Sequence, residues 1–391
     1  MQLRPTLHLA LLGLSLAGCD GLTFDTDPLP PLPSDGAGSG ATNACDGSGA
    51  LTFEGAPAEP GERCGRCGTL ECDEGTTGQL SCNEPSADCT ATIPLGERCT
   101  DNTTCTSGRC ATEPAGTAQD RCAPPGMVFI PAGTFVMGSP TSELDRDAGE
   151  TQHNVTLTRP FFMDRTETSQ AAWKALSGGI NPSFFQSPTG TDESSENNFD
   201  DGPVERVDWF SALAFANARS TADGLLACYT LLGCDDNGTG WQDGIHSGCT
   251  GATLPAGTAC SGYRLPTESE WEYGARAGAS SAFPWGEFED ANFLWFASNA
   301  GGRTQPVGTR QPNNWGLNDL LGNVWEWTWD AYGTYPSEAT DPLGAGEESA
   351  RCLRGGAFDT GRQFIRAATR ERNGGNATSQ TLGFRLVRTL P

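Results

Sequence analysis

The chain has 391 residues, which is more than one small domain needs and enough for one large domain or two modest ones. Its formal net charge of −25 argues against a nucleic-acid partner, because contacts to phosphates need lysine and arginine. A solvated acidic surface accounts for this charge without any acid-driven function. The three histidines, His8, His153 and His246, are too few for a histidine-rich catalytic metal site.

The first residues predict export. The sequence MQLRPTLHLALLGLSLAGC has one basic residue, Arg4, followed by an apolar run from Leu7 to Leu16. This run is too short to cross a bilayer as a mature helix and indicates a signal peptide over residues 1–18. Leu-Ala-Gly-Cys resembles the bacterial lipobox, which implies cleavage before Cys19, acylation of this cysteine and a stable membrane anchor. The alternative is an ordinary signal peptide in which Cys19 occurs by chance.

Residues 19–44 are rich in Pro, Gly, Ser and Asp and predict a flexible tether behind the acylated cysteine. Residues 45–125 hold few large apolar side chains, so we expect one or two small modules stapled by disulfides in an oxidising compartment. The alternative, a zinc or redox site at Cys64-Gly-Arg-Cys67, lacks a second such pair or a nearby histidine. The ten cysteines are Cys45, Cys64, Cys67, Cys72, Cys82, Cys89, Cys99, Cys105, Cys110 and Cys122.

The composition changes at Gly126, where aromatic residues and signals for helices and strands begin. Residues 127–137 predict two short strands on either side of Pro131-Ala132-Gly133. Much of the remaining chain is rich in Gly, Asn and Trp and shows little periodicity. We therefore predict one large α+β domain over residues 126–391, with much irregular structure and buried tryptophans.

Three stretches of this domain carry the signals of helix starts. A first helix is expected to start in Thr168-Ser-Gln-Ala-Ala-Trp173. Asp208 is expected to cap a second helix, WFSALAFANARS. Thr267 and Glu270 have the spacing of a capping box in front of WEYGARAG, which predicts a third helix.

The cysteines of the large domain predict two disulfides and one thiol. Cys228, Cys234, Cys249 and Cys260 bracket an insertion, and their even number and loop setting favour two bridges. Cys352 is then the odd cysteine. We expect it to be a buried free thiol, since free cysteine behaves as a small hydrophobic side chain.

Six motifs follow one another in the large domain: MVFIPAGTFVMGS (127–139), PVERVDWFSALAFAN (203–217), GYRLPTESEWEYGARAG (262–278), GLNDLLGNVWEW (316–327), LRGGAF (353–358) and LGFRLV (382–387). Together they resemble the formylglycine-generating enzyme family, also called the sulfatase-modifying factor domain. The resemblance runs from about Gly126 to Val387 and implies a variant C-type-lectin-like fold. It does not settle function, because one fold serves many functions.

The resemblance also implies two structural calcium sites made of oxygen ligands, as a hard cation requires. The first set is Asp319, Gly322, Val324 and Glu326, of which the two acids would bind through carboxylates and the other two through backbone carbonyls. The alternative is that both carboxylates pair with arginines such as Arg354 or Arg366 and need no ion. The second set is Asn292, Phe293, Asn299 and Gly301, although Asn299 stands where the family more often has Asp.

The family's enzymes carry two cysteines after paired glycines, and these bind copper(I) and activate oxygen to oxidise a substrate cysteine to formylglycine. The matching positions here hold Thr360 and Ile365, and a neighbouring Ser and His of the enzymes match Ala357 and Gly361. Copper(I) prefers soft sulfur ligands, so we expect neither copper nor a catalytic residue here. Cys352 lies before the glycines and is a poor substitute for either thiol.

These observations predict a lipoprotein anchored to the inner or outer membrane of a bacterial envelope. Its large domain would be non-catalytic and would bind or assist an unknown protein or glycan ligand of the envelope. One alternative is an oxidase of the same family that uses an unrecognised site. Another alternative is a purely structural envelope protein.

Overall fold

The computed structural model describes residues 123–187, 199–234, 249–344 and 350–390 with their side chains. Between residues 52 and 122 it describes the backbone of short strands. These are β1 (Thr52–Phe53) paired with β2 (Ala56–Pro57), then β3 (Arg63–Cys64), β4 (Gly68–Cys72) and β5 (Leu80–Asn83) in one sheet, and β6 (Cys110–Ala111) paired with β7 (Arg121–Cys122). The described residues do not include the predicted signal peptide, Cys19 or the tether. The described side chains do not include the cysteines of residues 45–125, so their predicted disulfides lie outside the description.

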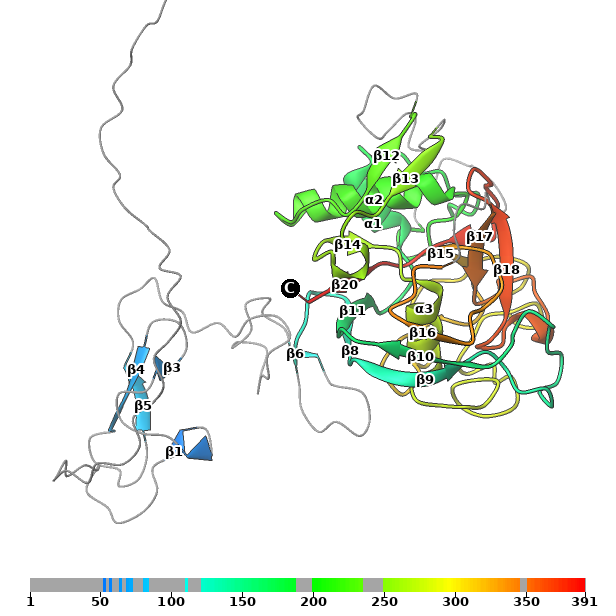
Figure 1. Ribbon diagram of the computed structural model, residues 1–391. Coiled ribbons are helices and arrows are strands. Elements are labelled where there is room, and N and C mark those ends of the chain that lie inside the picture. Colours follow the sequence, from blue (N-terminus) through cyan, green and yellow to red (C-terminus); the bar gives the residue numbers. More distant parts are fainter. Residues whose placement is uncertain are drawn as a thin grey trace, which may run out of the picture. The chain divides into compact units, whose positions relative to one another are not determined.

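The described strands of the large domain form two four-stranded sheets, one three-stranded sheet and a hairpin (Figure 1). The first four-stranded sheet has the order β14 (Tyr263–Arg264), β20 (Val387–Thr389), β11 (Phe161–Asp164) and β8 (Met127–Ile130). The second has the order β18 (Arg370–Gly374), β17 (Ala350–Arg354), β15 (Trp325–Ala331) and β19 (Leu382–Gly383). The three-stranded sheet has the order β16 (Glu338–Thr340), β10 (His153–Leu157) and β9 (Gly133–Met137), and the hairpin joins β12 (Thr230–Leu232) to β13 (Gly251–Thr253).

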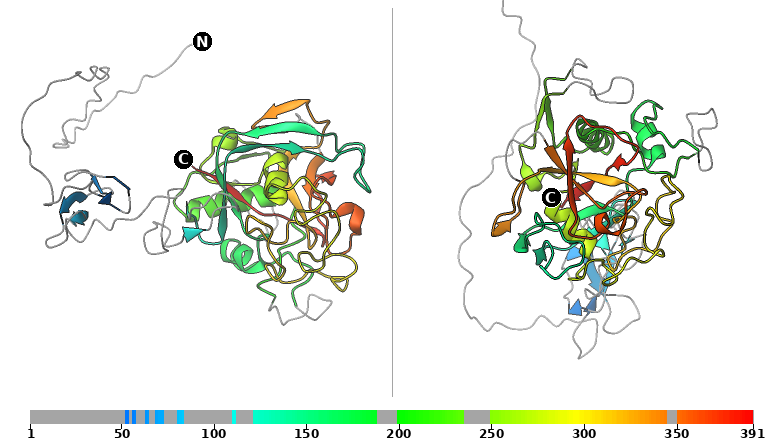
Figure 2. Two further views of the ribbon diagram at one scale, coloured as in Figure 1. Left: turned by 90° about the horizontal axis from the view of Figure 1, so that it is seen from below. Right: turned by 90° about the vertical axis from the view of Figure 1, so that its right-hand side faces the viewer.

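The described part of this domain has three α-helices, which are α1 (Gln170–Leu176), α2 (Trp209–Ala222) and α3 (Glu268–Arg276). Helix α3 contacts β9 on one side and β15 and β17 on the other, so it lies between two sheets (Figure 1). Figure 2 shows the orange strand β16 beside the cyan-green strands β9 and β10. The strands β8 and β20, which are the first and last of the domain, both pair with β11. This pairing holds the two ends of the domain together.

The predicted helix starts and the two predicted strands before them are confirmed. Ser169 accepts a hydrogen bond from the third residue of α1, and the Asp208 carboxylate accepts one from Ser211 N–H at 2.7 Å at the start of α2. Thr267 and Glu270 form the reciprocal capping box of α3. Among the described helices, none has both the length and the apolar character that a membrane span requires.

The core contains the tryptophans that the composition predicts, and their indole N–H groups are used to join elements. Trp209 Nε1 donates to the Thr328 carbonyl oxygen at 2.8 Å. Trp327 Nε1 donates to the Val207 carbonyl oxygen at the same distance, so the start of α2 and strand β15 are linked in both directions. The fully buried tryptophans are Trp173, Trp209, Trp271 and Trp327.

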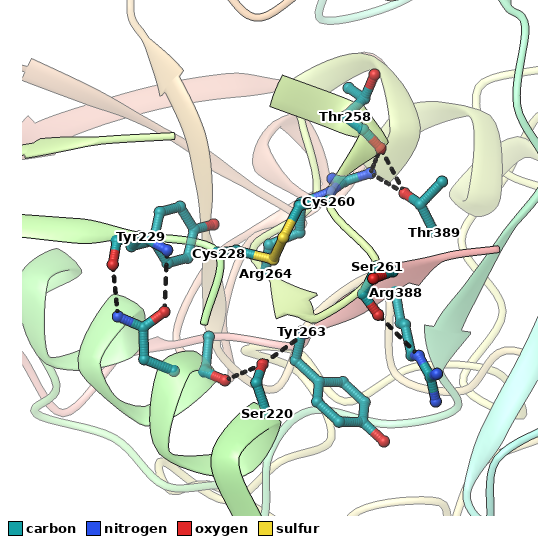
Figure 3. Close-up of a disulfide and its surroundings, with 12 residues drawn as sticks. Ser220, Cys228, Tyr229, Thr258, Cys260, Ser261, Tyr263, Arg264, Arg388 and Thr389 are labelled. Carbon is teal, nitrogen blue, oxygen red and sulfur yellow. Dashed lines mark hydrogen bonds between the residues drawn. A yellow bond between two sulfur atoms is a disulfide. The ribbon is translucent and has the colours of Figure 1, made fainter. Parts of the chain in front are cut away.

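The cysteine predictions for this domain are also confirmed. Disulfides join Cys228 to Cys260 and Cys234 to Cys249. Figure 3 shows the first bridge beside Tyr263, whose N–H donates to Ser220 Oγ at 2.8 Å and so ties the strand after the bridge to α2. Cys352 is a free cysteine, fully buried in β17.

Candidate functional site

Strand β17 ends in two glycines whose backbone forces a sharp turn. Gly355 and Gly356 have φ angles of +98° and +79°, a left-handed region that favours glycine. A Cβ on Gly355 would lie 2.5 Å from the Leu320 carbonyl oxygen, and one on Gly356 would lie 2.6 Å from Ile365 Cγ2. These contacts leave no room for a side chain at either glycine, and residues 357–365 fold back against the end of the strand.

The two positions that the motif resemblance matches to copper-binding cysteines lie in this turn. Thr360 Oγ1 donates to the Ala357 carbonyl oxygen and accepts from Ala357 N–H, both at 2.9 Å. Ile365 is fully buried in the apolar core. The hydroxyl and the alkyl group stabilise the turn, and neither is a soft ligand. Ala357 and Gly361 add no ligating side chain, so the residues of this turn do not fit copper(I).

The surface of the turn is held by Arg362 in the short 3₁₀ helix Arg362–Phe364. Its Nη1 donates to Asp145 Oδ2 at 2.6 Å, and its Nε donates to Glu289 Oε2 at 3.0 Å. Its Nη2 donates to the Glu287 carbonyl oxygen at 2.9 Å. Half-exposed ion pairs of this kind contribute little to stability, but they join the turn to two segments that are distant in sequence.

Cys352 does not replace the missing thiols. Its sulfur donates to Glu268 Oε2 at 3.4 Å, and Arg370 Nη2 lies 3.8 Å from it. Burial raises the pKa of this thiol, and the negative charge of Glu268 raises it further. The thiolate, which is the form that binds metals and attacks electrophiles, is therefore disfavoured.

A second group of charged side chains gathers around Arg385. Glu326, in β15, is fully buried, and its two oxygens accept hydrogen bonds from Arg385 Nη2 at 2.7 Å and Arg385 Nε at 2.8 Å. Trp271 Nε1 also donates to Glu326 Oε2, at 2.7 Å. The carboxylate of Glu326 is therefore neutralised and fully hydrogen-bonded.

The two arginines that the sequence offered as alternative partners bind other acids. Arg354 forms its ion pair with Glu272, and Arg366 pairs with Glu150 at 2.7 Å. An arginine does pair with Glu326, as the alternative expects, but it is Arg385 and not Arg354 or Arg366. The alternative does not account for Asp319, whose Oδ1 has no hydrogen-bond partner among the described residues.

Two further buried carboxyl groups lack this compensation. Neither carboxyl oxygen of Glu167 has a hydrogen-bond partner among the described residues. Asp319 has one bonded oxygen, Oδ2, which accepts from Gly308 N–H at 2.6 Å, while its Oδ1 has no partner among these residues. Burial raises the pKa of Glu167 well above its ordinary value, and the negative charge of Asp319 raises it further. Burial likewise raises the pKa of Asp319 to about 6.

These unsatisfied oxygens fit a hard cation. Asp319, Gly322, Val324 and Glu326 lie in and just after the turn that enters β15, and the structure adds Glu167 from the segment before α1. Three carboxyl groups around Arg385 leave negative charge that a divalent cation would neutralise. Within the described ranges no three His, Cys, Asp or Glu side chains form a ready-made metal site, so an ion here would also need the backbone carbonyls.

The second predicted calcium set differs, because both of its asparagine side chains form hydrogen bonds to residues nearby in sequence. The Asn299 side chain accepts from Phe296 N–H at 2.8 Å and donates to the Leu294 carbonyl oxygen at 2.9 Å, and Asn292 Nδ2 donates to Asp290 Oδ1. These bonds are local and do not bring the two asparagines together. The set that also includes Phe293 and Gly301 therefore stays a prediction.

Sequence reasoning missed Glu167 and Arg385. A lone acid two residues before a helix cap resembles any acid near a helix start. Arg385 left a better signal, because an arginine inside the apolar stretch LGFRLV needs a buried carboxylate as its partner.

Comparison with known proteins gives related sequences over most of the chain. Residues 112–390 match the family model of the sulfatase-modifying factor enzyme 1-like domain. The formylglycine-generating enzyme of Streptomyces coelicolor is 32% identical over 70% of this chain and 92% of its own. The inactive C-alpha-formylglycine-generating enzyme 2 of Mus musculus is 30% identical over 69% and 86%. The chaperone protein LppX of Paenibacillus barcinonensis is 30% identical over 52% and 71%.

A solved structure supports the fold. Treponema denticola variable protein 1 superposes with a TM-score of 0.57 at 26% identity, covering 72% of this chain and 99% of that one. The predicted α+β fold of the variant C-type-lectin-like type, with few helices and much irregular structure, is confirmed.

Removal of the Arg385 side chain should unfold the domain more readily than removal of a neighbouring arginine. In Arg385→Met the buried carboxylate of Glu326 loses its cation, which costs about 3–5 kcal/mol. Arg388→Met is the matched control, because Arg388 lies near it in sequence and is partly exposed. Chemical denaturation of both variants checks this, and equal losses of unfolding free energy would contradict it.

Proposed function

This chain belongs to the sulfatase-modifying factor enzyme 1-like family, and we propose that it is an exported, non-catalytic member that acts as a binding or accessory module. The observation that carries the proposal is the turn after Gly356. There, Thr360 and Ile365, which the motif resemblance matches to the enzymes' thiols, are built into the turn and the core. No soft ligand remains in the turn for copper(I).

The relatives support a role of this kind. One relative, whose similarity covers 69% of this chain, is named an inactive formylglycine-generating enzyme. Another relative is named a chaperone protein. The ligand we propose is a protein or a glycan of the envelope. A family oxidase with a different site is the second candidate, because a relative at 32% identity is a formylglycine-generating enzyme.

Aerobic incubation with copper and a peptide containing Cys-x-Pro-x-Arg tests this proposal. We expect no aldehyde by mass spectrometry, because the turn holds no thiol pair. The Streptomyces coelicolor enzyme, assayed in parallel, controls for the peptide and the copper. Formation of aldehyde by the present chain would overturn the non-catalytic proposal, and its loss in Cys352→Ser would then assign the activity to the buried thiol.

Export is supported by the two disulfides of the large domain, since such bridges persist in oxidising compartments. We propose further that lipid on Cys19 anchors the protein to a membrane. Changing Cys19→Ala should leave the protein unacylated and move it from the detergent-extracted fraction to the soluble fraction. Cys352→Ala serves as the control and should stay with the membrane. A Cys19→Ala protein that lacks lipid but still partitions with membranes would contradict the anchor.

We also propose that calcium binds between Glu167, Asp319 and the turn that enters β15. The support is the set of buried carboxyl oxygens without partners around an ion pair that is already satisfied. A cation that binds only the folded state stabilises it by about 2.7 kcal/mol at a hundredfold excess over its dissociation constant. Its role would be structural, because it neutralises acids in the core.

Chelation should therefore lower the melting temperature of the purified protein, and Glu167→Gln should shrink this shift. Glu205→Gln is a matched control, because Glu205 is also buried with one unpartnered oxygen among the described residues but lies outside the cluster. That control should melt with the full calcium dependence. Identical melting curves with and without chelator, together with no calcium by elemental analysis, would exclude the site.

A further inference from the structure

A cavity of about 310 Å³ lies between the three-stranded sheet and the second four-stranded sheet, beside the start of α3. None of its lining residues belongs to the turn at residues 357–365 or to the acid cluster around Arg385. Its size is that of a pocket for a small organic molecule. Most of its wall is apolar and comes from Met137, Ala331, Pro336, Ala339, Pro342 and Leu343.

Two of the charged residues in the wall, Glu268 and Arg370, satisfy each other. Arg370 Nε donates to Glu268 Oε1 at 2.6 Å, and Arg370 Nη2 donates to Glu268 Oε2 at 2.8 Å. Arg370 Nη1 donates to the Gly333 carbonyl oxygen at 2.9 Å, and Tyr335 OH donates to Glu268 Oε1 at 3.0 Å. A ligand would therefore find neither a free cation nor a free anion in this pair.

Asp330, also in the wall, forms no ion pair with any residue that the structure describes. Its side chain is 3% exposed, and its Oδ2 accepts from Glu268 N–H at 2.7 Å. No hydrogen bond joins its Oδ1 to any other residue that the structure describes, and no ion pair is formed there. Burial raises the pKa of Asp330 well above its ordinary value, and the negative charge of Glu268 raises it further. The ionised form of this acid therefore needs a positive charge beside it.

His153 places a second acceptor on the wall. His153 Nδ1 lies 3.1 Å from the Thr151 carbonyl oxygen, which can only accept, so Nδ1 carries the hydrogen. In the neutral ring Nε2 is then an acceptor. The His153 ring packs against the Tyr335 ring with centroids 4.5 Å apart, and so adds an aromatic surface beside this acceptor.

We propose that this cavity binds a small organic amine, with the protonated nitrogen on Asp330 Oδ1 and the apolar body against Met137, Ala339 and Leu343. The acceptors on Asp330 and His153 match a ligand that donates, and the apolar area matches a short alkyl or aromatic chain. The proposal goes beyond the accessory role and depends on neither copper nor calcium.

Hexylamine, hexanol and hexanoate, which share one alkyl chain and differ in charge, test this by calorimetry on the full chain at physiological salt. We expect hexylamine to bind at least tenfold more tightly than hexanol, and hexanoate not to bind. Asp330→Asn should weaken hexylamine at least tenfold while leaving hexanol unchanged. The asparagine keeps an oxygen that can accept from Glu268 N–H, so α3 retains this contact.

Two further variants separate the cavity from the acidic surface and from folding defects. Ala339→Phe fills the cavity and should abolish hexylamine binding even if Asp330→Asn proves unstable. Asp341→Asn removes an acid that is not a lining residue and whose partner is Thr158, so it should leave binding unchanged. Equal binding of the three probes, or an equal loss in Asp330→Asn and Asp341→Asn, would overturn the proposal.

Discussion

Helix α3 can lie in the core because each of its three glutamates meets an arginine from a different strand. An unpaired carboxylate at this depth would cost several kcal/mol, so the strands must place their arginines where the helix requires them. The attraction within each pair is largely offset by the desolvation of both charges. The pairs therefore contribute more to the geometry of the fold than to its free energy. They are Glu268 with Arg370 of β18, Glu270 with Arg264 of β14, and Glu272 with Arg354 of β17.

The Gly355–Gly356 turn and the amine cavity both depend on these pairs. Arg354 is the last residue of β17, so its bond to Glu272 fixes the point from which the Gly355–Gly356 turn starts. Arg370 closes one end of the amine cavity by holding Glu268. The same helix start presents the Glu268 N–H to Asp330 and so orients that carboxyl group. A single buried helix thus positions a turn and a cavity that share no residue.

Local features could be predicted from the sequence because their causes are local. The cap at Asp208 and the capping box at Thr267 depend on residues within one turn, and the family motifs identified the fold. The partner of Glu326 could not be predicted, because Arg385 lies 59 residues away and Arg354 and Arg366 carry the same charge. The cavity has no sequence signal at all, since it is the space left between two sheets.

In the turn at residues 357–365, Thr360 and Ile365 each stabilise the local structure. A thiol at position 360 would replace an oxygen that both donates to and accepts from Ala357, and sulfur forms weaker hydrogen bonds. A cysteine at position 365 would remove alkyl groups from a fully buried position, which destabilises a core by leaving a cavity. The turn is therefore stabilised by the residues that stand at the positions matched to the family's copper-binding cysteines. A stable surface turn held by Arg362 fits the binding role that we propose, in which a fixed shape matters more than a reactive group.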